Sequence, residues 1–409
     1  MNAYSRRPTC RVCESSKIVQ FLDLGVMPPA NAFLRKEDLD KPEEQFPLTV
    51  SFCEDCSLVQ TQDSVDPEIL FKDYVYMTSG SKPLVEHFER LAEKLKKDLK
   101  LGASDVAMEI GSNDGTFLAE LKDDCTVVGI EPASGVAKYG RDKGVTTEEA
   151  FFTSEFANGL KQKYGAARLI LASNVFAHIE TLQDVCKGIE LLLAENGVFV
   201  MEAHWVGNLI GEGGFDQIYH EHLCYYSLTS LTSLFKQFNL RIVDVEFIPT
   251  HGQSLRVYVA KGGDVQKTVS DVLEKERNLG LDKRATFEAF AEKVERNKQD
   301  IVSNIARLKK EGKCVVGYGA PAKGNTLLNY CGIGAESIDY IADATPFKQG
   351  LFTPGMHIPV VPIEKLRADA PEYILLLAWN YAPHILEKEK ALRESGIKFI
   401  IPVPEVRIV

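Results

Sequence analysis

The chain has 409 residues, of which 45% are hydrophobic and 26% charged, as expected for a folded protein of two or three domains. Its formal net charge of −11 does not suit a nucleic-acid surface, so we expect no nucleic-acid partner. No apolar run approaches the roughly 18 residues of a membrane span, so we expect no membrane partner. No signal peptide is evident, and the nine cysteines do not suggest a disulfide framework, so we expect a cytoplasmic location.

Two Cys-x-x-Cys pairs lie near the N-terminus, and their members are Cys10, Cys13, Cys53 and Cys56. Four thiolates of this kind can surround zinc as a tetrahedron that leaves no open position, so the predicted ion is structural. The long separation of the pairs is explained by an inserted loop or hairpin, and residues 24–31 are expected to form a turn-rich stretch. Two disulfides or unligated cysteines are the alternative.

An aromatic and hydroxyl-rich loop, residues 74–81, precedes a predicted amphipathic helix over 83–99. Tyr76 and Ser79 in this loop are within reach of a cofactor bound by the following domain. A tyrosine that merely packs within a connecting loop is the alternative interpretation.

The central motif is the segment 106–115, a buried strand that breaks into a loop bracketed by Gly111 and Gly115. A helix is predicted behind it over 116–122. The glycines allow a tight turn and a close approach to a ligand. A second apolar run ends at Glu131, twenty residues after Gly111, where a carboxylate can accept hydrogen bonds from ribose hydroxyls.

The charge of this loop indicates which cofactor it suits. Glu109 and Asp114 would repel the pyrophosphate of a dinucleotide, but they suit a phosphate-free cofactor with a cationic end, S-adenosylmethionine. An ordinary strand-to-helix turn remains the alternative. The predicted cofactor-binding residues are Tyr76, Glu109, Gly111, Asn113, Asp114, Gly115, Glu131 and Asn174.

From 104 to 262, strands and helices alternate as in a doubly wound sheet. A closing antiparallel hairpin favours a methyltransferase over a dehydrogenase. Asn174 and His178 follow a predicted strand, so they are expected at the carboxyl edge of the sheet, where ligands bind. The predicted strands are 105–110, 126–131, 168–173, 197–203, 240–248 and 254–260.

Tyr219, His220, Glu221 and His222 are consecutive. A His-x-His pair with an acid could ligate zinc, although no distant third ligand is evident. The same residues suit acid–base chemistry, in which a histidine takes a proton and a carboxylate orients it. A polar loop without a catalytic role is the third interpretation.

Residues 265–312 are predicted to be helical, notably 283–311, and a second strand-loop-helix follows at 314–326. Its order Lys-Gly excludes a P-loop, but Gly-x-Gly-x-x-Ala and strands at 338–342, 373–379 and 398–402 indicate a small Rossmann-like domain. Lys323, at a helix start, could hold a phosphate. A turn that serves the fold alone is the alternative. The predicted substrate-binding residues are Tyr318, Lys323, Gly324 and Asn325.

Four motifs in order, the cysteine pairs, Glu-Ile-Gly-Ser-Asn-Asp-Gly, Tyr-His-Glu-His and Gly-Tyr-Gly-Ala-Pro-Ala-Lys-Gly-Asn-Thr, resemble the sugar C-methyltransferases that make branched deoxysugars such as tetronitrose and mycarose. The resemblance covers essentially the whole chain. It implies α/β architecture with a zinc-binding domain (1–70), a class I methyltransferase domain (71–264), a helical connector (265–312) and a Rossmann-like C-terminal domain (313–409).

The resemblance also implies a nucleotide-linked 4-keto-6-deoxy sugar that is methylated at C3 through an enolate. His222 matches the general base, Tyr219 an assisting group, and Glu221 and His178 further active-site positions, while Tyr76 matches a cofactor contact. The rival hypotheses are an NAD-dependent oxidoreductase or epimerase acting on a nucleotide sugar, a non-catalytic nucleotide-sugar binder, and an O-methyltransferase. A monomer or weak homo-oligomer is expected.

Overall fold

The N-terminal part is built on an antiparallel sheet with the strand order β11-β4-β3-β2, beside a small β1-β5 ribbon. The structure, a computed structural model, describes residues 3–71, 77–249 and 253–409. Strand β2 extends to Met27, which pairs with Phe46, so the turn predicted for 24–31 begins later than expected. The elements of this part are β1 (Tyr4–Arg6), β2 (Ile18–Met27), β3 (Phe46–Cys53), β4 (Val59–Thr61), β5 (Asp63–Val65), α1 (Pro67–Phe71) and α2 (Lys82–Leu99).

The edge strand of this N-terminal sheet comes from elsewhere in the chain. Strand β11 (Cys224–Tyr225) directly follows the Tyr-His-Glu-His motif, and Cys224 and Tyr225 pair with Gln60 and Val59 of β4. The motif is therefore held by backbone hydrogen bonds to the cysteine-containing part. Sequence periodicity did not predict this two-residue strand.

The central part contains a seven-stranded sheet with the order β12-β13-β10-β9-β6-β7-β8, in which β13 is antiparallel to both of its neighbours. This confirms the predicted doubly wound sheet and its closing hairpin. Strand β8 was not predicted, and α3 ends at Ala119 rather than Lys122. The elements are β6 (Val106–Ile110), α3 (Thr116–Ala119), β7 (Thr126–Ile130), α4 (Ser134–Asp142), β8 (Thr146–Glu148), α5 (Ser154–Tyr164), β9 (Ala167–Ser173), α6 (Leu182–Leu192), β10 (Leu193–His204), α7 (Val206–Gly211), α8 (Leu228–Phe235), β12 (Arg241–Ile248) and β13 (Ser254–Ala260).

The C-terminal part has a six-stranded sheet with the order β16-β15-β14-β17-β18-β19, parallel except for β19. Its parallel core confirms an α/β domain, whereas the two-residue strands β16 and β19 were too short to predict. After the helices α9 (Lys267–Asn278) and α10 (Arg284–Lys310), the elements are β14 (Val315–Tyr318), α11 (Ala322–Cys331), β15 (Ile341–Ala342), β16 (Val360–Val361), α12 (Ile363–Asp369), β17 (Tyr373–Leu376), α13 (Ala382–Lys388), α14 (Lys390–Glu394), β18 (Lys398–Ile401) and β19 (Arg407–Ile408).

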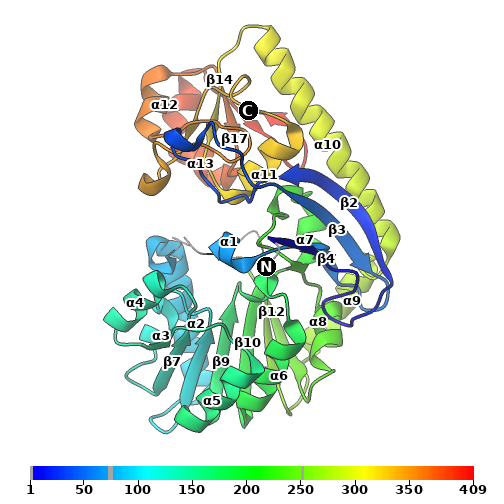
Figure 1. Ribbon diagram of the computed structural model, residues 1–409, viewed down its shortest axis with the longest axis vertical. Coiled ribbons are helices and arrows are strands. Elements are labelled where there is room, and N and C mark those ends of the chain that lie inside the picture. Colours follow the sequence, from blue (N-terminus) through cyan, green and yellow to red (C-terminus); the bar gives the residue numbers. More distant parts are fainter. Residues whose placement is uncertain (1–2, 72–76, 250–252) are drawn as a thin grey trace.

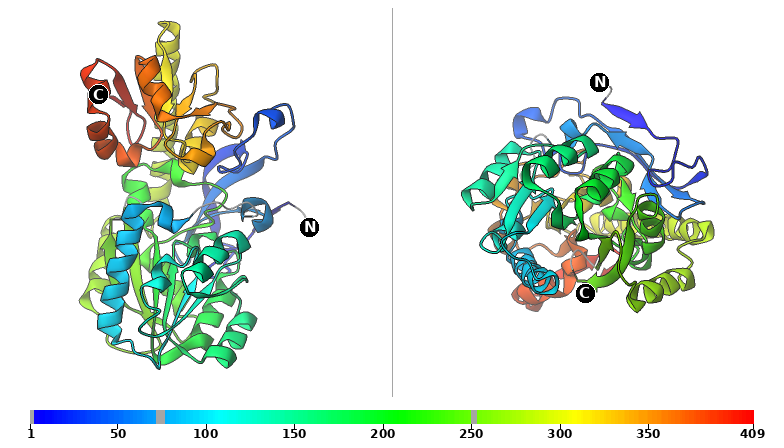
Figure 2. Two further views of the ribbon diagram at one scale, coloured as in Figure 1. Left: turned by 90° about the vertical axis from the view of Figure 1, so that its left-hand side faces the viewer. Right: turned by 90° about the horizontal axis from the view of Figure 1, so that it is seen from below.

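Helix α10 runs beside the C-terminal α/β body and along the β2–β3 hairpin, as Figures 1 and 2 show. Phe287 on this helix stacks on Phe52 of β3, with ring centroids 4.7 Å apart, and lies 5.4 Å from Phe21 of β2. At the middle of the helix, Asn297 donates a hydrogen bond to the Pro402 carbonyl at 2.8 Å. The helix thus binds the N-terminal and C-terminal parts together. Among the helices that the structure describes, none is long and apolar enough to cross a membrane.

Glu202, at the end of β10, is the centre of a buried charge network that joins four elements. Its carboxylate accepts hydrogen bonds from Arg256 Nε of β13 at 2.7 Å and from Ser173 Oγ of β9 at 2.8 Å. His87 of α2 contacts it at 3.0 Å. Burial alone would raise the pKa of Glu202, but His87 and Arg256 hold that pKa below its ordinary value.

We expect Arg256→Met to lower the free energy of unfolding by roughly 3 kcal/mol, because it leaves the buried Glu202 carboxylate without its guanidinium partner. The measurement is urea unfolding followed by circular dichroism. Lys267→Met, which breaks the exposed pair with Asp271, is the matched control and should unfold like the wild type. Equal unfolding midpoints for Arg256→Met and the control would contradict this account.

Candidate active site

The four predicted metal ligands, Cys10, Cys13, Cys53 and Cys56, converge in the N-terminal part. All four sulfurs lie within 4.8 Å of one another, with Cys10 Sγ 3.4 Å from Cys56 Sγ and Cys13 Sγ 3.5 Å from Cys53 Sγ. Sulfurs about 3.8 Å apart are expected around zinc at a Zn–S distance of about 2.3 Å. The donor set therefore fits a structural zinc ion, and the cysteines are free of disulfides.

The loop after β6 has the tight geometry predicted for a cofactor loop. Gly111 and Gly115 have φ values of 68° and 71°, in the left-handed region that favours glycine. A Cβ on Gly111 would lie 2.5 Å from Val175 Cγ2, so the loop after β9 packs directly against it. The two loops form a cradle that a larger side chain would fill.

Hydrogen bonds hold this loop in shape. Glu131 accepts from the backbone amides of Asn113 and Ala133, each at 2.9 Å, so one of its oxygens binds the glycine loop and the other binds the turn after β7. Asn113 and Asp114 accept from the amides of Thr78 and Ser79, which draws the segment after α1 onto the loop. Tyr76, a predicted cofactor contact, lies outside the described residues.

Glu109 is buried below this loop, and its Oε2 has no hydrogen-bond partner among the described residues. Burial, together with the charges of Asp114 and Glu131, raises its pKa well above the ordinary value. A cationic group bound here would satisfy both the unpaired oxygen and the negative potential, as the sulfonium and amine of S-adenosylmethionine would. Asn174 has a φ of 57° and directly follows β9. Its backbone N–H donates a hydrogen bond to the Glu202 backbone carbonyl.

His222 lies in a buried cluster of rings beside this loop. Its Nδ1 donates a hydrogen bond to the Gln217 carbonyl at 3.1 Å, since a carbonyl can only accept, and this leaves Nε2 as the basic nitrogen of the neutral ring. The Tyr219 hydroxyl lies 3.0 Å from Nε2. This arrangement prepares His222 to accept a proton at Nε2.

His178 and Glu221 complete the cluster. The rings of His178 and His222 lie 5.1 Å apart, and His178 Nδ1 donates to the Glu221 carbonyl at 2.6 Å. Burial lowers the pKa of His178, which favours its neutral form. Burial also raises the pKa of the Glu221 carboxyl, whose Oε1 accepts from Asn31 Nδ2 at 2.9 Å.

His220 is structural, because its Nε2 donates to the carbonyls of Phe46 and Pro47 at 3.2 Å, away from His222. The His-x-His metal site weighed from the sequence is therefore not formed. Within the described ranges, the four cysteines are the only cluster of metal-binding side chains.

Two residues of this cluster were missed in the sequence. His204 ends β10, and its ring lies 5.4 Å from that of His222. His204 directly follows a predicted strand, so its position at the carboxyl edge of the sheet could have identified it as a site residue. Asn31 comes from the N-terminal part, and only the folded structure brings it to Glu221.

A chain of buried contacts joins the segment 216–222, called the base segment below, to the glycine loop after β14. Asp216, just before Tyr219, accepts from Trp379 Nε1 at 2.6 Å, and Lys323 Nζ lies 4.0 Å from the centre of the Trp379 ring. Burial lowers the pKa of Lys323 to about 8, and its Nζ has no hydrogen-bond partner among the described residues. The ammonium contacts the Trp379 ring but donates no hydrogen bond among the described residues, so it is a candidate for binding an anion.

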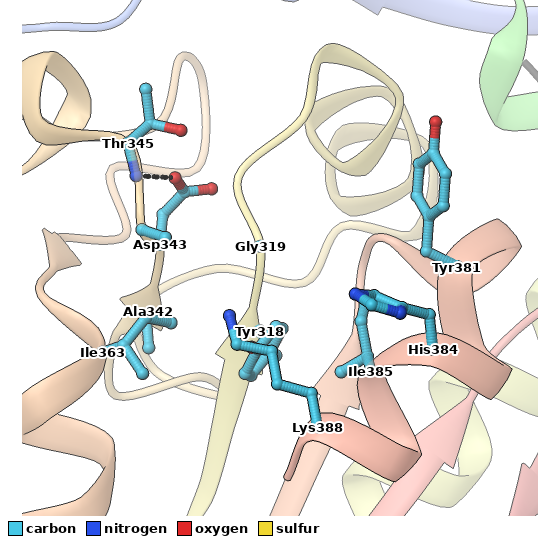
Figure 3. A pocket seen from close by; sticks show the side chains of 11 residues that line it. Tyr318, Gly319, Ala342, Asp343, Thr345, Ile363, Tyr381, His384, Ile385 and Lys388 are labelled. Carbon is cyan, nitrogen blue, oxygen red and sulfur yellow. Dashed lines mark hydrogen bonds between the residues drawn. The ribbon is translucent and has the colours of Figure 1, made fainter. Parts of the chain in front are cut away.

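The other predicted substrate residues have packing contacts. Gly324 packs on Leu377, Asn325 donates to the Ala30 carbonyl at 2.7 Å, and the Tyr318 hydroxyl donates to Glu389 at 2.9 Å. Beside Tyr318, a pocket of about 280 Å³ opens at the carboxyl ends of β14 and β15 (Figure 3). Further residues that line it are Gly319, Asp343, Thr345, His384 and Lys388.

The seven-stranded sheet, the glycine loop and the acid after β7 define a S-adenosylmethionine-dependent methyltransferase, and residues 84–245 match the family model for a methyltransferase domain. Residues 10–71 match the model for a zinc binding domain, and residues 249–404 match a C-methyltransferase C-terminal domain. The chain is also 37% identical over 404 residues to the C-methyltransferase NovU of Streptomyces niveus, which covers 98% of this chain and 96% of NovU.

The chain belongs to this family of C-methyltransferases, which confirms the predicted sugar C-methyltransferase family, its two cofactors and its enzyme class. Two solved structures that match this chain each cover less than half of it. Magnesium protoporphyrin IX methyltransferase from Synechocystis PCC 6803 has a TM-score of 0.32 at 11% identity, covering 44% of this chain and 79% of its own. A methyltransferase from Anabaena variabilis has a TM-score of 0.32 at 12% identity, covering 42% and 84%.

We expect Gly111→Ala to weaken S-adenosylmethionine binding by about tenfold or more, because the added Cβ meets Val175 and alanine disfavours a positive φ. Isothermal titration calorimetry measures the Kd. Gly135→Ala, in α4 with open space around the added Cβ, is the matched control and should bind like the wild type. Equal affinities of both variants would contradict the role of this loop.

Proposed function

We propose that the protein methylates C3 of a nucleotide-linked 4-keto-6-deoxy sugar, after removing a proton from the carbon next to the ketone. The observation that carries the proposal is the pairing of His222 Nε2 with the Tyr219 hydroxyl in a buried cluster between two glycine loops. Such a pair supplies a base and a hydrogen-bond donor side by side, as enolate formation requires.

A continuous chain of contacts supports a single site for cofactor, sugar and nucleotide. Gly111 packs on Val175, and the same loop carries His178 to the His222 ring. From the base segment, Asp216 contacts Trp379, which lies beneath Lys323. The cofactor loop, the base and the buried cation are thus neighbours, although each lies more than 100 residues from the next in sequence.

S-adenosylmethionine, when bound, supplies an electrophilic methyl group but no base. His222 fills that need, since its Nδ1–H is held by the Gln217 carbonyl and its Nε2 can take the proton. The positive charge that then forms on His222 lies beside the Tyr219 hydroxyl, which can turn from Nε2 to the substrate's ketone oxygen.

The enolate oxygen needs hydrogen-bond donors in a dry site. Tyr219 offers a hydroxyl, and the raised pKa of Glu221 favours a protonated carboxyl that can also donate. His178 packs against the His222 ring, and burial lowers its pKa and favours its neutral form, so it does not repel the imidazolium. Tyr219 and Glu221 therefore favour the negative charge on the enolate oxygen, and neutral His178 does not oppose the positive charge on His222.

Lys323 and the pocket beside Tyr318 suit the nucleoside diphosphate. An ammonium without a hydrogen-bond partner can pair with phosphate oxygens, and His384 and Lys388 add basic side chains to the pocket. Membership of the C-methyltransferase family does not favour the NAD-dependent alternative, and it favours carbon over oxygen as the acceptor.

The test is to incubate the enzyme with S-adenosylmethionine and thymidine, guanosine or cytidine diphosphate 4-keto-6-deoxy sugars, and to analyse products by mass spectrometry and NMR. A new methyl group on C3 supports the proposal. Methylation of a hydroxyl, or of none of these sugars, would refute it.

We expect His222→Gln to lower kcat by about 100-fold or more, because the general base is lost. Tyr219→Phe should lower kcat by about tenfold, because the enolate oxygen loses one hydrogen-bond donor. Both losses should also slow deuterium exchange at C3 in deuterated water, which NMR measures without methyl transfer. His357→Gln, outside this cluster, is the histidine control. Wild-type exchange by His222→Gln would exclude His222 as the base.

The pKa of about 8 for Lys323 predicts a pH dependence of substrate capture. The ammonium is charged below this pKa, so kcat/KM for the nucleotide sugar should fall as pH rises through about 8. Lys323→Arg keeps its charge at every accessible pH and should remove this fall, whereas Lys323→Met should be poor throughout. The measurement is kcat/KM at saturating S-adenosylmethionine, and an unchanged profile in Lys323→Arg would contradict the assignment.

A further inference from the structure

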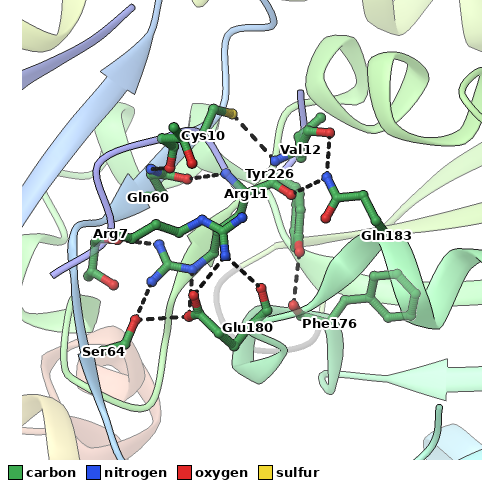
Figure 4. A network of polar contacts seen from close by, with 12 residues as sticks. Arg7, Cys10, Arg11, Val12, Gln60, Ser64, Phe176, Glu180, Gln183 and Tyr226 are labelled. Atoms are coloured by element: carbon green, nitrogen blue, oxygen red, sulfur yellow. Dashed lines mark hydrogen bonds and ion pairs between the residues drawn. The ribbon is translucent and has the colours of Figure 1, made fainter. Parts of the chain in front are cut away.

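Arg11 stands between the first two zinc ligands and is completely buried (Figure 4). Its Nε donates to Glu180 Oε2 at 2.9 Å, and its Nη2 donates to Ser64 Oγ at 2.6 Å. Its Nη1 donates to the Thr61 carbonyl. A buried guanidinium is costly to desolvate, so one with this many directed bonds defines the position of its partners more than it stabilises the fold.

Glu180 links Arg11 to the first histidine of the site. It follows His178 by two residues, so the ion pair fixes the end of the loop that carries His178. Burial alone would raise the pKa of Glu180, but Arg11 and Arg7 hold that pKa below its ordinary value, so the pair is ionic. Gln183 adds two hydrogen bonds, from its Nε2 to the carbonyls of Arg11 and Val12 at 2.7 and 2.8 Å.

Thr61 links Arg11 to the second histidine. While its carbonyl accepts from Arg11, its amide donates to the carbonyl of Leu223, the residue after His222, at 3.0 Å. The amide of Leu223 in turn donates to the Ala177 carbonyl at 2.6 Å. Arg11 therefore contacts the segment that carries His178 through Glu180 and reaches the segment that carries His222 through Thr61, and these two segments also bind each other.

We propose that Arg11 is a positioning residue that sets the separation of His178 and His222, with Glu180 as its partner. The zinc site would thereby serve catalysis, by holding Arg11 in place, as well as folding. The kinetic part of this inference rests on the proposed function. A displacement of about 1 Å at a reacting centre can cost on the order of 100-fold in rate, so small changes at Arg11 should be measurable.

The test uses the full-length, zinc-loaded enzyme. Glu180→Gln keeps the shape and removes the charge, Arg11→Lys keeps the charge and removes the fork of donors, and Arg11→Met removes both. Lys17→Met, which breaks the exposed pair with Asp55 beside the same zinc site, is the matched control. Zinc content and the number of S-adenosylmethionine sites per chain, from a binding titration, count the correctly folded molecules in each preparation.

The first measurement is backbone hydrogen exchange by mass spectrometry, which needs no substrate. We expect faster exchange in 174–180 and 219–225 for Glu180→Gln and Arg11→Met, with unchanged exchange in the cofactor loop 106–116. Unchanged exchange in both histidine segments would overturn the proposal. If Arg11→Met loses zinc or loosens throughout, the same comparison in Glu180→Gln decides the question.

The second measurement is kinetic. We expect kcat and the rate of deuterium exchange at C3 to fall together by about tenfold or more, while KM for both substrates stays within about twofold. Lower stability with wild-type kcat per S-adenosylmethionine site would mean that Arg11 only supports the fold, and would overturn the proposal. If the wild type does not turn over any 4-keto sugar, the proposed function fails, and hydrogen exchange still tests the role of Arg11.

Discussion

The pairing of β11 with β4 is the interaction on which the proposed active site depends. It joins Cys224 and Tyr225 to a sheet whose other strands lie before residue 62, so the base segment is continuous with the zinc-bound part. Without this edge, Tyr219 and His222 would lie on a long surface connection between β10 and α8. With it, an irregular segment gains the rigidity of a sheet, which acid–base geometry requires.

The strongest local patterns allowed most of the architecture to be predicted. Buried parallel strands, the glycine loops, the closing hairpin and the cysteine pairs each leave a local signal. Strands of two or three residues, such as β8 and β16, are too short for periodicity to detect. The site was predicted in part: the motif containing His222 is contiguous, but no local pattern reveals that Asn31 reaches Glu221 or that His220 turns away to Phe46.

The two α/β sheets share one structural feature, an acidic residue that accepts two backbone hydrogen bonds at the carboxyl end of a strand. After β7, Glu131 accepts from the amides of Asn113 and Ala133, and after β15, Asp343 accepts from those of Ala320 and Thr345. In each case an acid ties a glycine loop to the turn that follows the next strand. Both loops therefore have their shape before a ligand arrives, which lowers the entropy lost on binding.

Helix α10 has a consequence for how the enzyme opens. Spanning about 40 Å, it is fixed to the N-terminal hairpin by the Phe287 stack on Phe52 and to the C-terminal sheet end by Asn297. A hinge motion that swung the C-terminal α/β body away from the N-terminal hairpin would have to unpack these buried contacts. Separation of the C-terminal sheet from this hairpin is therefore resisted by ring packing and by a buried hydrogen bond, whereas surface loops can rearrange without breaking either contact.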